Sequence, residues 1–155
     1  MKYIQENKDY DGCIFCLAAK SDEDFDNLVF HRGKHAFMIL NRYPYTSGHV
    51  MCVPYAHQAH LQDLTPETRS EIMELTTKAV QVLQSLYQPE GFNVGLNLGE
   101  MAGAGIEQHL HMHIVPRWGG DTNFMSTIGE TRVLPEALNQ TYQRVKQAWE
   151  EFKES

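Results

Sequence analysis

The chain lacks three features that would assign it to large classes of protein. No apolar run among its 155 residues approaches the roughly 20 residues that a membrane-spanning helix needs, and the opening MKYIQENKDYDG has no apolar stretch of the kind found in secretory signals. Its 13 Lys and Arg are outnumbered by 20 Asp and Glu, which gives a net charge of −7 without a basic cluster. We therefore expect neither a membrane nor a nucleic-acid polymer as partner, although a small phosphate ligand needs only a few local donors.

Cysteine is also scarce, with only Cys13, Cys16 and Cys52. An odd number of cysteines, a tight Cys-x-x-Cys pair and no secretory signal argue against a disulfide framework. We therefore expect a reducing, cytoplasmic location. In such a compartment Cys-x-x-Cys is typical of half a metal site or of a redox pair.

Apolar segments and turn residues alternate along the chain in a way that predicts an α+β fold. Thr65 and Pro66 supply an N-cap and a first helical residue, and Pro89 with Gly91 ends the same helix. A second helix is expected from near Pro135. Strands are expected at 28–31, 35–41, 49–54, 92–98 and 109–115. This order predicts a single domain over residues 1–155, with an antiparallel sheet of about five strands and two main helices.

The expected last helix carries a narrow apolar seam. Its members are Leu138, Tyr142, Val145, Trp149 and Phe152, spaced by four, three, four and three residues. Such a seam suits packing on the sheet or on a partner chain.

The segment HLHMHIV, residues 109–115, places three histidines in five positions. Its period-two alternation is typical of a half-buried strand, which would turn His109, His111 and His113 to one face. Same-face neighbours on a strand lie roughly 6.5–7 Å apart, so the three rings could serve one cleft without all touching.

Two kinds of chemistry suit such a row of imidazoles. Neutral imidazole is a nucleophile, a proton carrier and the commonest metal ligand. The three rings could therefore bind one catalytic metal, or they could divide several roles between them. Cys13 and Cys16 have the spacing of half a tetrahedral zinc site, and the remaining ligands could come from His57, His60 or the histidine row. A polar strand face without a function is the remaining alternative.

The segment QHLHMHIVPRW resembles the signature of the histidine triad (HIT) nucleotide-binding family, His-x-His-x-His followed by two apolar residues. CIFC, ILNRYPYTSGHVMCVP, LNLG and PRWGGDTNF are similar to one branch of that family. That branch includes dinucleoside tetraphosphate phosphorylases and related hydrolases. The resemblance covers nearly the whole chain and implies a single domain with a HIT-like fold.

The resemblance implies a separate role for each histidine. His111 occupies the place of the nucleophile, which attacks the α-phosphorus and forms a covalent nucleotidyl-histidine. His113 matches the histidine that binds phosphate oxygens. In zinc-containing relatives the first histidine of the row joins the metal, which implies a structural zinc site. The ligands of that implied site are Cys13, Cys16, His57 and His109.

Further positions match nucleotide contacts of the family. Asn41 matches a ribose contact, and Asn97 a polar position near the phosphates. Gly103 and Gly105 lie in a glycine-rich link that could bring backbone N–H groups to phosphate, and Arg117 could meet either phosphate or a surface carboxylate. Many relatives carry Gly-Gln-Ser or Gly-Gln-Thr before the triad, where residues 103–106 read GAGI. That departure leaves the preferred leaving group open.

Together these features predict a homodimeric enzyme that cleaves a phosphoanhydride of a dinucleoside polyphosphate. Diadenosine tetraphosphate is the leading substrate, with phosphate or water as acceptor and Mg²⁺ as a possible companion of the substrate. A nucleoside phosphoramidase with the same nucleophile is one alternative. A zinc-stabilised nucleotide-binding module with little turnover is another, and a metalloenzyme with all three histidines at one ion is a third.

Overall fold

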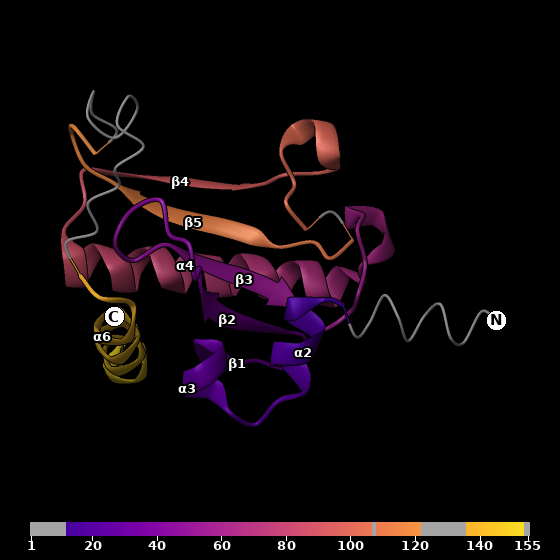
Figure 1. Cartoon of the computed structure of the whole chain (residues 1–155), viewed down its shortest axis with the longest axis horizontal. Helices are drawn as coiled ribbons and strands as arrows, with labels where there is room; N and C mark the ends of the chain where they lie inside the picture. Colours follow the sequence, from indigo (N-terminus) through magenta and orange to yellow (C-terminus); the bar gives the residue numbers. More distant parts are fainter. Residues whose placement is uncertain (1–11, 107, 122–135, 154–155) are drawn as a thin grey trace.

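A five-stranded antiparallel sheet forms the centre of the molecule (Figure 1). The structure is a computed structural model and describes residues 12–106, 108–121 and 136–153. The strand order is β1-β2-β3-β5-β4. The strands are β1 (Val29–Arg32), β2 (Ala36–Leu40), β3 (Val50–Pro54), β4 (Gly91–Leu96) and β5 (Met112–Arg117). This architecture confirms the predicted α+β fold with an antiparallel sheet of five strands.

Burial follows the order of the strands. Every residue of the neighbouring strands β2 and β3 is buried, which explains why both read as continuous apolar runs. β4 is at one edge of the sheet, and its residues are half-buried or exposed. The apolar core therefore lies around β2 and β3.

The long helix α4 (Pro66–Tyr87) packs along the sheet against β2, β3 and β5 (Figure 1). Its N-cap is Thr65, whose hydroxyl accepts a hydrogen bond from the Thr68 N–H at 3.1 Å, as the sequence predicts. The chain leaves the helix at Gln88, which has a left-handed φ of 51°, directly before Pro89. The predicted start and end of this helix are both confirmed.

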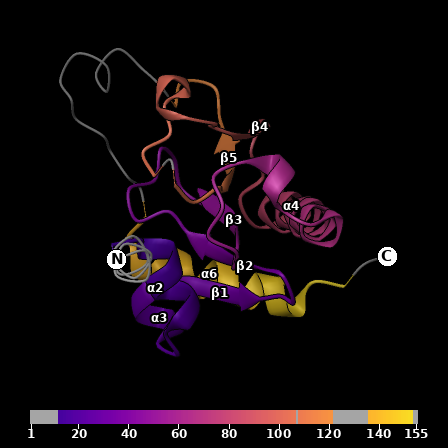
Figure 2. The same cartoon turned by 90° about the vertical axis from the view of Figure 1, so that its right-hand side faces the viewer.

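The last helix, α6 (Leu138–Glu151), buries its apolar seam within its own chain. Tyr142, Val145 and Trp149 are each at most 3% exposed, and α6 packs against β1 and α4 (Figure 2). The Tyr142 hydroxyl donates to the Val29 carbonyl at 2.7 Å. The apolar seam is thus buried within one chain, so it gives no support to a dimer. Pro135 lies outside the described residues.

Two short α-helices and two 3-10 turns complete the described part of the chain, and none of them is evident from the sequence pattern. Two lie beside β1 (Figure 2): α2 (Ile14–Lys20) and α3 (Asp24–Asn27). Single 3-10 turns occur at η1 (Leu61–Asp63) and η2 (Glu100–Ala102). The Arg32 guanidinium donates to the Ala18 and Ala19 carbonyls at 2.9 and 2.8 Å, so one side chain of β1 fastens the end of α2.

The histidine strand begins later than predicted. β5 starts at Met112, so His109 and His111 precede it. The reason is that the backbone before Met112 bonds outside the sheet. The Leu110 N–H donates to the carbonyl of Gln58 at 2.8 Å, and Gln58 lies after the end of β3. The expected single row of three rings on one strand is therefore wrong, and the first histidine is directed elsewhere.

No helix in the described ranges is long and apolar enough to cross a membrane. That all 155 residues form one domain stays a prediction.

Candidate functional site

Four side chains that are far apart in the sequence meet in one compact group. Cys13 is the N-cap residue of α2, and Cys16 lies in the first turn of that helix. His57 follows β3, and His109 precedes β5. Their ligand atoms all lie within 4.8 Å of one another. We call this group the Cys₂His₂ cluster.

Distances within the Cys₂His₂ cluster are close to the edges of a tetrahedron around a metal ion. His109 Nδ1 is 3.4 Å from Cys13 Sγ and 3.5 Å from Cys16 Sγ. His57 Nδ1 is 3.2 Å from both Cys16 Sγ and His109 Nδ1. Bonds of about 2.0–2.3 Å to a tetrahedral zinc ion separate its ligands by roughly 3.3–3.8 Å. The four residues therefore fit a closed, structural metal site.

Hydrogen bonding selects the nitrogen with which His109 faces the cluster. Its Nε2 lies 2.8 Å from the carbonyl oxygen of Pro54. A carbonyl can only accept, so Nε2 carries the hydrogen and Nδ1 keeps its lone pair toward the cluster. Burial lowers the pKa of His109 to about 4. Burial, and then the hydrogen bond with Cys13, raises the pKa of Cys16 to about 12, and a bound cation would offset this penalty on the thiolate.

His111 is held as the tautomer that can act as a nucleophile. Its Nδ1 lies 2.9 Å from the backbone carbonyl oxygen of His109, so Nδ1 must carry the hydrogen. Burial lowers the pKa of His111, against a smaller opposing effect of that hydrogen bond. A neutral ring with hydrogen on Nδ1 has its lone pair on Nε2. The ring of Phe15 packs against His111 with centroids 4.9 Å apart.

His113 is held as the opposite tautomer by a histidine at the start of β3. The Tyr45 N–H donates to His49 Nδ1 at 3.2 Å, so His49 carries its hydrogen on Nε2. That Nε2 lies 2.9 Å from His113 Nδ1, which must accept, and His113 then carries its own hydrogen on Nε2. Burial, and then the nearby His111, lowers the pKa of His113 to about 4.

The two adjacent rings thus offer complementary groups. Their centroids are 4.9 Å apart, with a lone pair on Nε2 of His111 and an N–H on Nε2 of His113. A lone pair can attack an electrophile, while an N–H can donate to an oxygen that gains charge. The pair is suited to displacement at a phosphorus or acyl centre.

His109 connects the Cys₂His₂ cluster to the pair formed by His111 and His113. Its ring belongs to the Cys₂His₂ cluster, and its backbone carbonyl accepts from Nδ1 of His111. One residue therefore fixes both the closed cluster and the tautomer of the neighbouring ring. The rings of His109, His111 and His113 thus face different partners, which favours separate roles over the alternative of one metal shared by all three.

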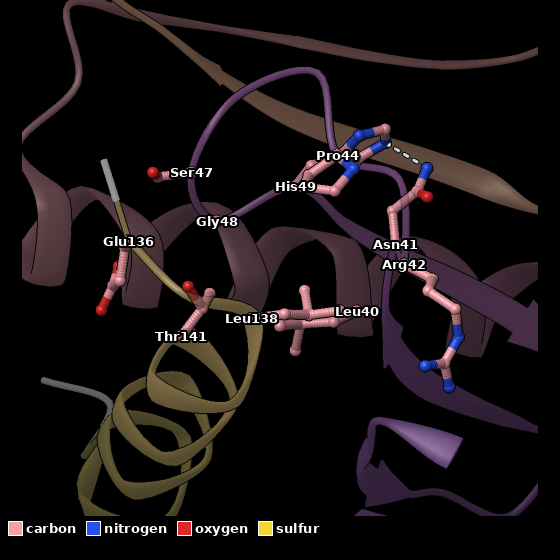
Figure 3. Close-up of a pocket in the computed structure, with 10 residues that line it drawn as sticks. All are labelled: Leu40, Asn41, Arg42, Pro44, Ser47, Gly48, His49, Glu136, Leu138 and Thr141. Carbon is pink, nitrogen blue, oxygen red and sulfur yellow. Dashed lines mark hydrogen bonds between the residues drawn. The ribbon is translucent and has the colours of Figure 1, made fainter. Parts of the chain in front are cut away.

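A pocket adjoins these rings where β2 ends, below the loop that leads to β3 and beside the start of α6 (Figure 3). Its lining residues are Leu40, Asn41, Arg42, Pro44, Ser47, Gly48, His49, Glu136, Leu138 and Thr141. Asn41 Nδ2 lies 3.4 Å from His49 Nε2 (Figure 3). Asn41 therefore borders the His49–His113 contact, and among the histidine rings His49 alone lines this pocket.

The other nucleotide-binding positions expected from the sequence lie in two places. The strand register pairs Leu96 with Met112, so Asn97 follows β4 at the level of His111 and is exposed. Gly103 ends η2 with a φ of 91°, and its N–H donates to the Glu100 carbonyl at 2.9 Å. That N–H is already engaged in this conformation.

Gly105 follows Gly103 in the same link, where an added Cβ would meet no atom within 4 Å. Arg117 ends β5 and pairs with both carboxylate oxygens of Asp121, at 2.6 and 2.9 Å. Of the two partners expected for Arg117, the structure thus shows the carboxylate. The phosphate-binding roles of Asn97, Gly103, Gly105 and Arg117 stay predictions.

His49 is the site residue that sequence reasoning missed. It precedes Met51 and Cys52 in the primary sequence, and no short spacing relates it to His113, 64 residues away. The available signal is a lone imidazole at the start of an otherwise apolar strand. Its partner becomes evident only when β3 pairs with β5 and sets Met51 opposite His113.

Comparison with known proteins gives a consistent picture. A family model described as HIT domain matches residues 23–120. An AP-4-A phosphorylase of Mycobacterium tuberculosis is 47% identical over 126 residues, covering 81% of this chain and 65% of that protein. The chain thus spans somewhat less than two thirds of the length of that relative. An adenosine 5'-monophosphoramidase of Schizosaccharomyces pombe is 31% identical over 106 residues, covering 68% and 74% of the two chains.

The fold is also found in solved structures. A zinc-bound histidine triad family protein from Mycobacterium smegmatis matches with a TM-score of 0.71 and 22% identity. The match covers 91% of this chain and 95% of that one.

The lowered pKa of His113 predicts how folding stability depends on pH. Its ordinary pKa in an unfolded chain is about 6.5, so between this value and about 4 the unfolded chain binds a proton that the folded chain does not. The free energy of unfolding should therefore fall as the pH decreases through this window. In a His113→Gln variant, the free energy of unfolding in urea, measured between pH 7 and 4.5, should decline less steeply with falling pH. The difference in slope should correspond to the uptake of up to about one proton. Equal slopes in the two proteins would contradict the assignment.

Proposed function

Because the chain belongs to the histidine triad (HIT) family, we propose that it cleaves a phosphoanhydride of a dinucleoside polyphosphate through a covalent nucleotidyl-His111 intermediate. Diadenosine tetraphosphate is the leading substrate, with Mg²⁺ accompanying its phosphates and phosphate or water as acceptor. The relative named AP-4-A phosphorylase supports this choice of substrate. The setting we propose is the cytosol, where the free cysteines would stay reduced.

The observation that carries the proposal is the pairing of opposite tautomers on His111 and His113. The lone pair on Nε2 of His111 attacks the α-phosphorus, and an N–P bond forms. The bridging P–O bond breaks, and its electron pair leaves with the departing phosphate, which accepts a hydrogen bond from the N–H on Nε2 of His113. Water or phosphate then attacks the same phosphorus, the N–P bond breaks, and its electron pair restores the neutral His111 ring. When water is the acceptor, the proton that it loses passes to the solvent.

The remaining polar positions would hold the nucleotide. Asn41 lines the pocket beside His49, and Asn97 lies at the level of His111. We assign them to the ribose and the phosphates, respectively. Gly105 lies in open space and could approach phosphate, whereas Gly103 and Arg117 would first have to release the contacts they make here.

A nucleoside phosphoramidase is the second candidate, supported by the phosphoramidase among the relatives. It would use the same lone pair of His111 and expel an amine instead of a phosphate. A nucleotide-binding module with little turnover is the third, although the ordered nucleophilic tautomer of His111 favours turnover.

Separation of products distinguishes these candidates. The protein is incubated with diadenosine tetraphosphate and Mg²⁺, with and without phosphate. ADP plus ATP formed only with phosphate would establish phosphorolysis, and AMP plus ATP would establish hydrolysis. Absence of products, with release of ammonia from adenosine 5'-phosphoramidate, would replace our proposal by the phosphoramidase.

Removal of the nucleophile should separate chemistry from binding. His111→Ala is expected to lower turnover by roughly 10⁴-fold or more, because the alanine side chain has no lone pair with which to attack. Nucleotide affinity should stay within about tenfold, or roughly 1.4 kcal/mol, since the ring is small relative to the whole ligand. Turnover at the wild-type rate in this variant would rule out the covalent route.

We further propose that the Cys₂His₂ cluster binds zinc as a structural ion. The supporting observations are the near-tetrahedral spacing of its four ligand atoms and the zinc-bound relative of the same fold. Zinc would neutralise two buried thiolates there and fix α2 to the segment before β5. It would act on the reaction only through the position of His109.

Metal analysis tests this assignment with a control in the same chain. Cys13→Ser should lose most of the bound zinc, because a hydroxyl is a poor ligand for it, whereas the purified wild type should contain about one zinc per chain. Cys52 is also buried but lies outside the cluster, so Cys52→Ala should keep its zinc. Equal zinc contents in Cys13→Ser and the wild type would remove the proposed site.

We also propose a homodimer, now supported by the edge strand β4 rather than by α6. Val94 is 45% exposed and Leu98 is 46% exposed, at an edge that pairs with no other strand in the described ranges. Apolar side chains on an open edge favour pairing with a second copy.

Light scattering should therefore give about twice the 17.8 kDa mass of one chain. Val94→Lys should shift the protein toward monomer, because a charge would enter the apolar contact. Met73→Lys on α4, where Met73 is 54% exposed, should leave the mass unchanged. A monomeric wild type would exclude the dimer.

A further inference from the structure

The short helix α2 supplies two residues of the Cys₂His₂ cluster, and it is packed on one face only. It has seven residues, and isolated helices shorter than about 12 residues are marginal in water. Phe15 on its inner face is 1% exposed, whereas Ile14 and Leu17 on its outer face are 59% and 50% exposed. The contacts at the two ends of α2 therefore contribute to its position.

The first end of α2 belongs to the site. Cys13 directly precedes the helix and makes no N-cap hydrogen bond with its side chain, and Cys16 lies in the first turn. Between them, Phe15 packs against the rings of His109 and His111, with centroids 5.5 and 4.9 Å apart. A shift of α2 would therefore move two cluster ligands together with the ring that borders the proposed nucleophile.

The other end of α2 is held by Arg32, the last residue of β1. Its guanidinium donates to the carbonyls of Ala18, Ala19 and Ser21 at 2.9, 2.8 and 2.7 Å. The last carbonyls of a helix have no partner within it. The same guanidinium donates from Nε and Nη2 to Asp24 Oδ1 at 3.0 and 2.8 Å. One planar group thus ties the end of α2 to β1 and α3, which lie beside it (Figure 2).

Arginine is suited to this contact by its geometry. Its N–H groups point outward in one fixed plane, so a single side chain can serve several carbonyls and a carboxylate together, whereas the lysine ammonium is a point charge on a flexible stem. A positive charge is also favourable at the C-terminal end of a helix. The hydrogen bonds of Arg32 therefore fix the orientation of α2 as well as its location.

We propose that Arg32 is a positioning residue for the Cys₂His₂ cluster. By holding the far end of α2, it presents Cys13 and Cys16 to His57 and His109 at ligand distances. This inference rests on the proposed zinc site. Release of this end should have two consequences, which are faster loss of zinc and exposure of two thiols that are otherwise buried.

A role of Arg32 in general stability alone makes a different prediction. Cys52 is also buried, but it lies in β3 at the centre of the sheet. Opening of the whole core would expose Cys52 together with Cys13 and Cys16. Release of α2 would expose Cys13 and Cys16 alone, so Cys52 is a control within the same chain.

Two measurements on the purified protein separate these roles. Transfer of zinc to a chromogenic chelator gives the rate of metal loss. Alkylation by iodoacetamide in the presence of the same chelator, followed by peptide mass spectrometry, gives the reactivity of each cysteine. In Arg32→Lys, zinc loss and the alkylation of Cys13 and Cys16 should each be about tenfold faster, while alkylation of Cys52 should stay within about twofold of the wild type.

Three further variants complete the experiment. Arg144 on α6 also pairs with a carboxylate, that of Glu136 at 3.0 Å, so Arg144→Lys is the matched control and should change neither rate. Val145→Ala opens a cavity in the core and should raise the alkylation of all three cysteines by a common factor. Asp24→Ala removes the carboxylate that orients the guanidinium. It should raise the alkylation of Cys13 and Cys16 about threefold, and it provides the comparison if Arg32→Lys does not fold.

Several outcomes would refute the inference. It fails if zinc loss or the alkylation of Cys13 and Cys16 in Arg32→Lys equals that of the wild type. It also fails if Cys52 becomes more reactive by the same factor, or if Arg144→Lys gives the same change. In these cases zinc that is bound by the wild type and lost in Cys13→Ser would leave the proposed metal site intact. A wild type without zinc would refute both.

Discussion

The geometry of the site depends on the two contacts of His109. Its ring nitrogen Nδ1 faces two thiols and His57 in the Cys₂His₂ cluster, and its carbonyl oxygen accepts from Nδ1 of His111. A shift of the main chain at this residue would disturb both contacts together. The cluster also joins three pieces of chain: α2, whose Phe15 packs against His111, the segment after β3, and the segment before β5, which contains His111. A closed cluster of this kind can therefore hold a reactive ring in place without taking part in its chemistry.

Burial and hydrogen bonding together determine what each imidazole can do. Burial keeps the rings of His111 and His113 neutral by lowering their pKa values. Each neutral ring then has one donor and one acceptor, and its fixed partner decides which nitrogen is which. A carbonyl accepts from His111, whereas the Nε2 hydrogen of His49 is donated to His113. Identical side chains thus acquire opposite tautomers because their neighbours differ.

Much of the fold follows from local patterns in the sequence. The N-cap at Thr65 and the stop at Pro89 define α4 because both effects act within one helical turn. The apolar runs that become β2 and β3 identify central strands because no polar side chain interrupts them. The short helix α2 escapes such reasoning, since seven residues give no clear period, and its end is held by the Arg32 side chain of β1.

The sequence by itself determined the α+β class, the main helices, most strands, and the chemical types gathered at the site. Residue type and spacing also identified Cys13 and Cys16 as half a metal site, with His57, His60 and the histidine row as possible further ligands, and the choice of His57 and His109 was implied by the resemblance to the HIT family. Only the tertiary structure decided that β5 begins after His111 and that His49 supports His113. Only the tertiary structure showed that the seam of α6 is buried in its own chain. These properties depend on contacts between residues far apart in the chain, and no local pattern of side chains specifies such contacts.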